Sequence, residues 1–283
     1  MSGKLFARMA VIFLALAFTA VSCDKVDEET VKDADIATLT DEAVASYLFN
    51  DIFSLAGNSG RQVDQLLTNK DKSALAVDGE SCPEITITPF NLTDWPKTVV
   101  LDFGEGCTHE GITRSGKIVI TVTDWFWKEG SEWSIGFENY MVLDHMVEGS
   151  KTVTFNGRNE DGNFNWDINV ENAVITRPDE TTISWSAQRN REWVAGVQTP
   201  FNPADDEYLI RGSGSGVNAE GIPYTVTIAE PLNILLSCPW IRSGVILIDA
   251  EGRPVVEVDF GDGECNNTVT VTVEGHSKEI ELG

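Results

Sequence analysis

Residues Asn163-Phe164-Asn165-Trp166-Asp167-Ile168-Asn169-Val170 alternate strictly between polar and apolar side chains. The same period of two returns near the end of the chain, in Thr268-Val269-Thr270-Val271-Thr272-Val273. Because successive side chains of a β-strand point to opposite faces, each run predicts a strand with one apolar and one polar face. Such strands are typical of antiparallel sheets, whereas parallel sheets usually bury both faces. The predicted fold class is therefore all-β.

Turn-forming residues separate further apolar runs from about residue 84 onward. Their spacing predicts roughly a dozen strands joined as hairpins. We expect residues 81–283 to form one large antiparallel meander, either a two-sheet sandwich or a single curled sheet. The turns lie at Lys128-Glu129-Gly130, Asn156-Gly157 with Asp161-Gly162, Pro178-Asp179, Ala219-Glu220-Gly221 and Glu251-Gly252.

Residues 40–80 have a helical pattern and are predicted to cap the sheet. Thr40 suits a helix N-cap because acidic residues follow it in the first turn. Gly57 is expected to end this helix, and a second short helix is expected over residues 61–67, before a loop at 68–81. The apolar positions at helical spacing are Val44, Tyr47, Leu48, Ile52 and Leu55.

The first 22 residues have the features of a bacterial lipoprotein signal peptide. Lys4 and Arg8 precede a short apolar run over residues 10–18, and Ala20-Val21-Ser22-Cys23 matches a lipobox. We therefore predict export, cleavage before Cys23 and lipid anchoring through that cysteine; the alternative is an ordinary secretory signal with a chance cysteine. Residues 23–39, acidic and without apolar periodicity, are expected to form a flexible tether.

The chain of 283 residues has a formal net charge of −25. Nucleic acid and anionic membrane surfaces would repel it, so no nucleic-acid partner is expected. The expected contact with a membrane is through the lipid anchor. A glycan or another envelope protein remains a candidate partner, although such acidity also simply keeps a surface soluble.

Four cysteines remain once Cys23 is set aside. Two similar phrases contain them: each begins with Cys-Pro, continues through an apolar strand and ends on a glycine-rich turn with the second cysteine. In an oxidising compartment this predicts bridges Cys82 to Cys107 and Cys238 to Cys265, each stabilising the fold by about 3 kcal/mol. Cross-pairing between the phrases is the alternative. Close cysteine pairs typical of zinc sites are absent from the sequence, so no metal site is predicted.

No motif in the sequence assigns catalytic residues or a cofactor. Residues 212–216, Gly-Ser-Gly-Ser-Gly, lack the glycine spacing of a nucleophile elbow and precede a strand rather than a helix, so we interpret them as a flexible β bend. Oxygen-rich glycine turns at 156–163 and 259–264 are an open alternative for calcium, but hairpin turns use the same residues.

Three tryptophans are the candidate ligand-binding residues. A strand over residues 118–127 would place Trp125 and Trp127 on the face opposite Ile118, with Trp133 following across a turn. Such a face could stack on sugar rings. The alternative is that these rings pack under a loop, a helix or a second sheet, as most tryptophans do.

Several phrases resemble a group of Bacteroidetes-type lipoproteins that have no established activity. They are residues 95–107, residues 111–118, Arg191-Glu192-Trp193, Tyr224-Thr225-Val226-Thr227 and Cys238-Pro239-Trp240-Ile241. The resemblance covers most of residues 80–282. For such proteins, the acidic run Asp24-Lys25-Val26-Asp27-Glu28-Glu29 resembles a signal for display on the cell surface. The sorting rule of other Gram-negative bacteria would instead read Asp24 as a signal for inner-membrane retention.

These observations predict a lipid-anchored outer-membrane protein, displayed on the cell surface or, alternatively, facing the periplasm. Its expected role is that of a non-catalytic binding or structural component of the envelope. One alternative is a glycan-binding lipoprotein that assists polysaccharide uptake, with Trp125, Trp127 and Trp133 as the stacking platform. A second alternative is a hydrolase whose catalytic acidic residues cannot be told apart from the other acidic residues of the sequence.

Overall fold

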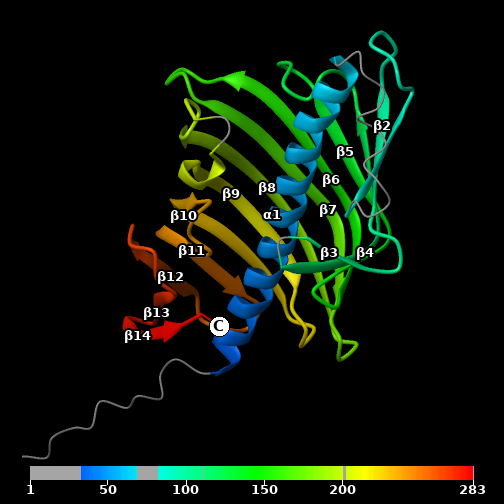
Figure 1. Cartoon of the computed structure of the whole chain (residues 1–283). Helices are drawn as coiled ribbons and strands as arrows, with labels where there is room; N and C mark the ends of the chain where they lie inside the picture. Colours follow the sequence, from blue (N-terminus) through cyan, green and yellow to red (C-terminus); the bar gives the residue numbers. More distant parts are fainter. Residues whose placement is uncertain (1–32, 69–81, 110, 200–201, 283) are drawn as a thin grey trace, which may run out of the picture.

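The computed structural model describes residues 33–68, 82–109, 111–199 and 202–282. One long helix lies across the concave face of a single 14-stranded antiparallel sheet that curves around it (Figure 1). The predicted all-β antiparallel fold is confirmed, and of the two architectures expected it is the curled sheet. Within the described ranges, the sheet is not closed into a barrel.

The strands follow one another in chain order, so the sheet is a meander. Its order runs from β1 to β14, with only β3 outside the path, where it pairs with β4. The strands are β1 (Glu84–Thr88), β2 (Lys97–Asp102), β3 (Cys107–His109), β4 (Ile112–Val122), β5 (Glu132–Val142), β6 (His145–Arg158), β7 (Phe164–Thr176), β8 (Thr182–Ala195), β9 (Glu207–Val217), β10 (Pro223–Leu235), β11 (Ile241–Ala250), β12 (Val256–Asp262), β13 (Thr268–Val273) and β14 (His276–Glu281), and a 3₁₀ turn, η2 (Pro203–Asp205), precedes β9.

Most predicted turns lie between strands, but one does not. Asn156-Gly157 lies inside β6, where the register with β7 shifts between Phe155 and Arg158. Two tight hairpins were not predicted from the sequence. One joins β13 to β14 through Glu274 and Gly275, whose φ values are 50° and 83°. Leu143 and Asp144 join β5 to β6 with positive φ of 49° and 60°, the geometry of a type I′ turn, although neither residue is glycine.

The N-terminal helical region is one helix, α1 (Asp33–Thr68), and not two short ones. Thr40 is therefore not an N-cap: its hydroxyl donates to the Ile36 carbonyl within the helix at 3.0 Å. Gly57 does not end the helix, because the buried stripe continues through it to Val63. The last residues of the predicted tether, 33–39, are helical, and the predicted loop over residues 69–81 lies outside the described residues.

Aromatic packing holds α1 against the inner face of the sheet. Phe53 lies 5.9 Å from Trp166 of β7 and 6.1 Å from Trp133 of β5, measured between ring centroids. Phe49 packs 5.3 Å from Trp185 of β8. Since tertiary packing stabilises most helices in proteins, this buried stripe explains why two internal glycines do not interrupt α1.

Both predicted disulfides are present. Cys82 is bonded to Cys107, and Cys238 is bonded to Cys265, with Cα–Cα distances of 5.9 and 5.8 Å. The first joins the segment before β1 to β3, and the second joins the β10–β11 connection to the segment before β13. Each therefore fastens a region near one end of the meander.

Asp64 of α1 is a partly buried acid whose removal should stabilise the protein. Burial raises the pKa of its carboxyl to about 6, against the lowering effect of the Phe126 backbone N–H. Because the pKa of Asp64 is raised in the folded state, folding favours the protonated carboxyl. The stability that this group contributes is therefore fully present below its ordinary pKa of 3.8 and is lost as the pH rises through 6. We expect Asp64→Asn to raise the free energy of unfolding by about 1 kcal/mol at pH 7.5.

Urea denaturation at pH 4 and pH 7.5 checks this expectation. The difference in the free energy of unfolding between Asp64→Asn and the unsubstituted protein should shrink toward pH 4, where Asp64 is itself protonated in the folded state. Asp161→Asn, in an exposed turn, is the control. A difference of the same size at both pH values would contradict the assignment.

Candidate functional site

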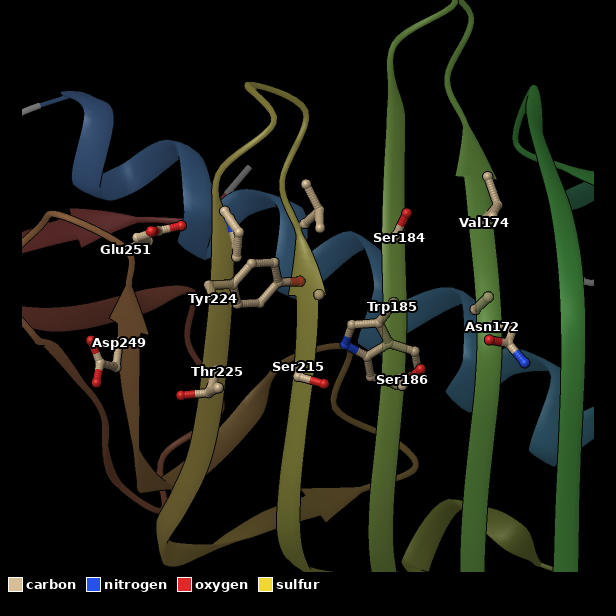
Figure 2. A pocket seen from close by; sticks show the side chains of 14 residues that line it. Asn172, Val174, Ser184, Trp185, Ser186, Ser215, Tyr224, Thr225, Asp249 and Glu251 are labelled. Carbon is tan, nitrogen blue, oxygen red and sulfur yellow. The ribbon is translucent and has the colours of Figure 1, made fainter.

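Strands β7 to β11 carry a shallow trough on the face of the sheet that points away from α1. Trp185 and Tyr224 point toward α1, because both donate hydrogen bonds to Glu42. Their neighbours Ser184 and Thr225 therefore point to the opposite, solvent-exposed face. The trough has a volume of about 730 Å³, and in Figure 2 its strands lie in front of the helix.

Small outward side chains make this part of the sheet hollow. Strand register places Ser186 of β8 opposite Ser215 of β9, and Ser215 opposite Thr225 of β10. Thr225 in turn lies opposite Asp249 of β11. We call these four residues the hydroxyl row. Because neighbouring strands lie about 4.8 Å apart, the row presents polar groups at regular intervals and ends in a carboxylate.

The lining of the trough offers hydrogen bonding. Each hydroxyl can donate one hydrogen bond and accept two, while the ionised carboxylates of Asp249 and Glu251 are acceptors with no donor. Asn172 adds an amide at the β7 side. The lining contains no histidine, lysine or cysteine. The arrangement therefore suits a neutral ligand with many hydroxyl groups, or a ligand that carries positive charge.

A buried carboxylate supports the floor of the trough from the other side. Glu42 of α1 accepts hydrogen bonds from Trp185 Nε1 at 2.8 Å, Arg189 Nη2 at 3.1 Å and the Tyr224 hydroxyl at 3.3 Å. Burial raises the pKa of the Glu42 carboxyl, and the Arg189 guanidinium opposes that rise. These contacts connect β8 and β10 to the helix, so the strands beneath the hydroxyl row are held in fixed positions.

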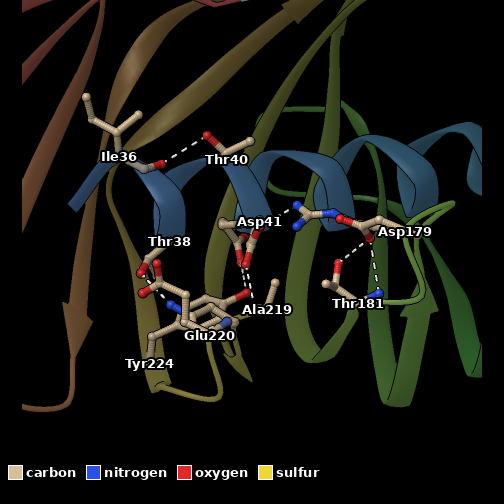
Figure 3. Close-up of polar contacts among 12 residues, drawn as sticks. Ile36, Thr38, Thr40, Asp41, Asp179, Thr181, Ala219, Glu220 and Tyr224 are labelled. Carbon is tan, nitrogen blue, oxygen red and sulfur yellow. Dashed lines mark hydrogen bonds and ion pairs between the residues drawn. The ribbon is translucent and has the colours of Figure 1, made fainter. Parts of the chain in front are cut away.

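A second carboxylate fixes the hairpin loops at one end of the trough (Figure 3). Asp41 accepts a charged hydrogen bond from Arg177 and a backbone hydrogen bond from Ala219 at 2.7 Å. Asn218 donates to the Thr38 hydroxyl at 2.9 Å. The β7–β8 and β9–β10 loops are thus both bound to the first turns of α1.

Residues 212–216 lie within β9, and the stretch is irregular only at Gly212, which has a positive φ of 128° and lies where the register between β9 and β10 shifts. β9 is paired with β8 over residues 212–216 and with β10 over residues 213–216. A Cβ on Gly216 would lie 2.9 Å from the Tyr224 ring, and one on Gly214 would lie 3.3 Å from the Arg189 guanidinium. The nearest atoms are backbone oxygens of β8, Ser184 O at 2.3 Å from the Gly216 position and Ser186 O at 3.2 Å from the Gly214 position, so close approach of β8 and these two side chains together favour glycine.

The three candidate tryptophans do not form an exposed platform. The predicted strand to Trp127 is wrong, because β4 ends at Val122 and the chain turns before β5. Trp133 is 1% exposed, and Trp127 packs 5.5 Å from Trp166, under the helix. Trp125, half-buried, packs 5.5 Å from Trp95. The alternative interpretation, packing under a helix, holds for Trp127 and Trp133.

Sequence reasoning did not find the hydroxyl row. The serines of β9 were visible in the sequence, but the row depends on the register of four strands. A weak signal was present in the alternation of serine or threonine with inward residues, for example Ser184-Trp185-Ser186. Cys23, the predicted lipidation site, lies outside the described residues.

Among the residues that the structure describes, no group of three histidine, cysteine or acidic side chains is arranged to hold a metal ion. In the same part of the chain, no helix combines the length and the hydrophobicity that crossing a membrane requires.

No protein-family model, curated protein or solved structure matches this chain. The resemblance to Bacteroidetes-type lipoproteins therefore stays a prediction, and the functional argument depends on the geometry of the chain itself.

Proposed function

We propose that this chain is a non-catalytic binding protein of the bacterial envelope, and that the trough on β7 to β11 is its ligand-binding surface. The hydroxyl row carries the proposal, because it places hydrogen-bonding groups at regular intervals on a rigid, exposed surface. Buried contacts from Glu42 and Asp41 hold that surface in place, so little ordering is needed when a ligand binds.

The proposed ligand is a glycan chain. Sugars offer hydroxyl groups along an extended polymer, which complement Ser186, Ser215 and Thr225 along the row. Asp249 and Glu251 would accept hydrogen bonds from sugar hydroxyls and would disfavour anionic polysaccharides. Neutral or amino-sugar polymers are therefore the first class to test. The proposal replaces the tryptophan platform with a trough on a different part of the sheet, whose lining combines the hydroxyl row with apolar side chains such as Val174, Val217 and Pro223.

Removing single hydroxyls from the row should weaken glycan binding. We expect Ser215→Ala or Thr225→Ala to lower affinity about fivefold each, since one hydrogen bond contributes about 1 kcal/mol. Isothermal titration calorimetry, with an oligosaccharide that the unsubstituted protein binds, measures the change in affinity. Thr272→Ala, an outward hydroxyl on β13 outside the trough, is the matched control and should bind like the unsubstituted protein. Unchanged affinity in both trough variants would rule out the row.

The proposed cellular setting is the outer membrane, with Cys23 acylated and the sheet displayed on the cell surface. The lipobox at residues 20–23 and the acidic run that follows support this setting. Cys23→Ala should move the protein from the membrane fraction to the soluble fraction. Protease treatment of intact cells should degrade the unsubstituted protein while a periplasmic control survives. Protection from the protease would favour the periplasm-facing alternative.

A further inference from the structure

A β-bulge at the β7 end of the trough extends the hydroxyl row by one strand. The register of β7 with β8 shifts between Val170 and Ala173, so the two residues between them lie opposite Ser186 alone. Asn172 is the second of these two, and its φ of 51° is in the left-handed region. Because Ser186 is the first member of the hydroxyl row, the extended row runs from the Asn172 amide on β7 to the Asp249 carboxylate on β11.

The neighbouring strands account for the backbone of this bulge. Gly149 of β6 lies so close that a Cβ on it would be 2.7 Å from both the Asn172 carbonyl oxygen and the Ala173 Cα. A similar bulge occurs in β5, where Asn139 has a φ of 49° and a Cβ on Gly116 would lie 2.1 Å from its carbonyl oxygen. Asn139 does not line the trough. Bulges bend a sheet, so the curl explains the backbone at Asn172 but not the side chain that it presents to the trough.

The Asn172 amide is available to a ligand. Along other parts of the outer face, polar side chains bind each other: Asn190 donates to Asp167 at 2.8 Å, and Asn156 donates to Asn165 at 3.0 Å. Among the residues that the structure describes, no side chain forms a hydrogen bond with the Asn172 amide or with the hydroxyls of the row. The polar groups of the trough therefore keep their full capacity for an external partner.

An apolar side chain lies beside this amide. Val174 is two residues further along β7, so it points to the same face as Asn172, roughly 7 Å away, and both line the trough (Figure 2). Val174 is half-buried. The β7 end thus combines an amide with methyl groups, whereas the β11 end offers the carboxylates of Asp249 and Glu251.

We propose that the β7 end of the trough is a subsite for the acetamido group of an N-acetylated amino sugar, with Asn172 as a specificity-determining residue. This inference rests on the proposed glycan-binding function and narrows its ligand class. An acetamido group has an N–H donor, a carbonyl acceptor and a methyl group. The Asn172 amide can exchange two hydrogen bonds with it, because it also has both a donor and an acceptor, while the methyl group packs against Val174.

Three hexasaccharides with the same linkage test the inference, because they differ only in one substituent of each sugar ring. Chitohexaose carries acetamido groups, its deacetylated form carries ammonium groups, and cellohexaose carries hydroxyls. Isothermal titration calorimetry of the purified full chain should give chitohexaose at least a tenfold higher affinity than cellohexaose. Equal affinity for these two, or tightest binding of the ammonium form, would overturn the subsite while leaving the proposed glycan function intact. Binding of none of the three would also overturn the subsite, and a wider polysaccharide panel then decides the proposed function separately.

Matched substitutions in the two bulges separate binding from folding. Asn172→Gly keeps a residue that readily adopts a positive φ but removes the amide, so chitohexaose affinity should fall about tenfold while cellohexaose affinity changes less than twofold. Asn139→Gly makes the same change outside the trough and should leave both affinities unchanged. Val174→Thr, which replaces a methyl group with a hydroxyl, should also lower chitohexaose affinity selectively. Equal losses in Asn172→Gly and Asn139→Gly, or unchanged chitohexaose affinity in Asn172→Gly, would overturn the role of Asn172.

A short peptide controls for recognition of amides in general. Tetra-alanine offers amide and methyl groups but lacks sugar hydroxyls, so it cannot complement the serine and threonine side chains of the row in the same way. We expect a tenfold molar excess of tetra-alanine to leave chitohexaose binding unchanged. Displacement of chitohexaose by the peptide at equal concentration would overturn the assignment of an amino sugar.

Discussion

Replacing Gly60 with alanine is expected to lower the free energy of unfolding by about 2 kcal/mol. An alanine Cβ at this position would lie 2.2 Å from Cδ1 and 2.5 Å from Cγ of the Phe126 ring. Phe126 is completely buried and packs 5.0 Å from Trp133, so its ring has little room to move. Overpacking of this kind costs about 1–3 kcal/mol or more, which exceeds the gain of about 1 kcal/mol from helix propensity.

Gly57, one turn earlier in the same helix, is the matched control. A Cβ there meets no atom within 4 Å, so Gly57→Ala should be neutral or should stabilise the protein by up to about 1 kcal/mol. Urea denaturation followed by circular dichroism compares the two variants. If both alanines had the same effect, close packing of α1 against Phe126 would not be the reason for glycine at position 60.

Removing Arg114 is expected to cost about 3 kcal/mol. Its guanidinium donates to both carboxylate oxygens of Asp51, at 2.6 and 3.2 Å, and thereby joins β4 to the middle of α1. Burial lowers the pKa of Arg114, but hydrogen bonding to Asp51 and its negative charge outweigh that effect, so the pKa is raised overall. Arg114→Gln would leave the Asp51 carboxylate, 13% exposed, without its counter-charge. Breaking a buried pair typically costs about 3–5 kcal/mol.

An exposed ion pair on the same strand serves as a control, because it separates the effect of burying a charged pair from the effect of removing a charge. Lys117 of β4 forms an ion pair with Asp102 at 2.7 Å, but the two side chains are 43 and 32% exposed. Lys117→Gln should change stability by less than about 0.5 kcal/mol, because solvent screens exposed pairs. The double variant Asp51→Asn/Arg114→Gln should be less destabilised than the sum of its single variants. Strict additivity would show that the pair does not couple the helix to the sheet.

The strands and disulfides could be predicted from the sequence because both depend on local patterns. Alternation over residues 163–170 reports directly on a strand with one buried face, and the observed β7 has that face against α1. The repeated cysteine phrases likewise place each pair at the ends of one strand-turn unit. These features require no knowledge of how distant segments meet.

The helix boundaries could not be predicted because tertiary contacts override local signals. Gly57 and Gly60 resemble helix ends in sequence, yet one faces a cavity and the other allows close approach to Phe126. Thr40 with its following acids resembles an N-cap, but Asp41 instead binds Arg177, in the β7–β8 loop. That partner is 136 residues away in the chain.

The candidate sites were not predictable for the same reason. The hydroxyl row exists only in the register of four strands, and each serine or threonine is unremarkable alone. Trp127 and Trp133 were singled out as exposed ligand contacts, but they line a small cavity between the helix and the sheet because the chain leaves β4 at Val122 and turns toward the helix. Beyond the end of a strand, the alternation of side chains no longer predicts which face a residue occupies.

A binding screen against a panel of neutral and amino-sugar polysaccharides tests most directly whether the outer trough binds a glycan. The purified chain is compared with Ser215→Trp, which fills the trough at an exposed strand position, and with Thr272→Trp, which places the same ring outside it. We expect saturable binding of at least one polysaccharide, a loss of affinity of tenfold or more in Ser215→Trp, and no change in Thr272→Trp. No saturable binding across the panel, or full binding by Ser215→Trp, would contradict it.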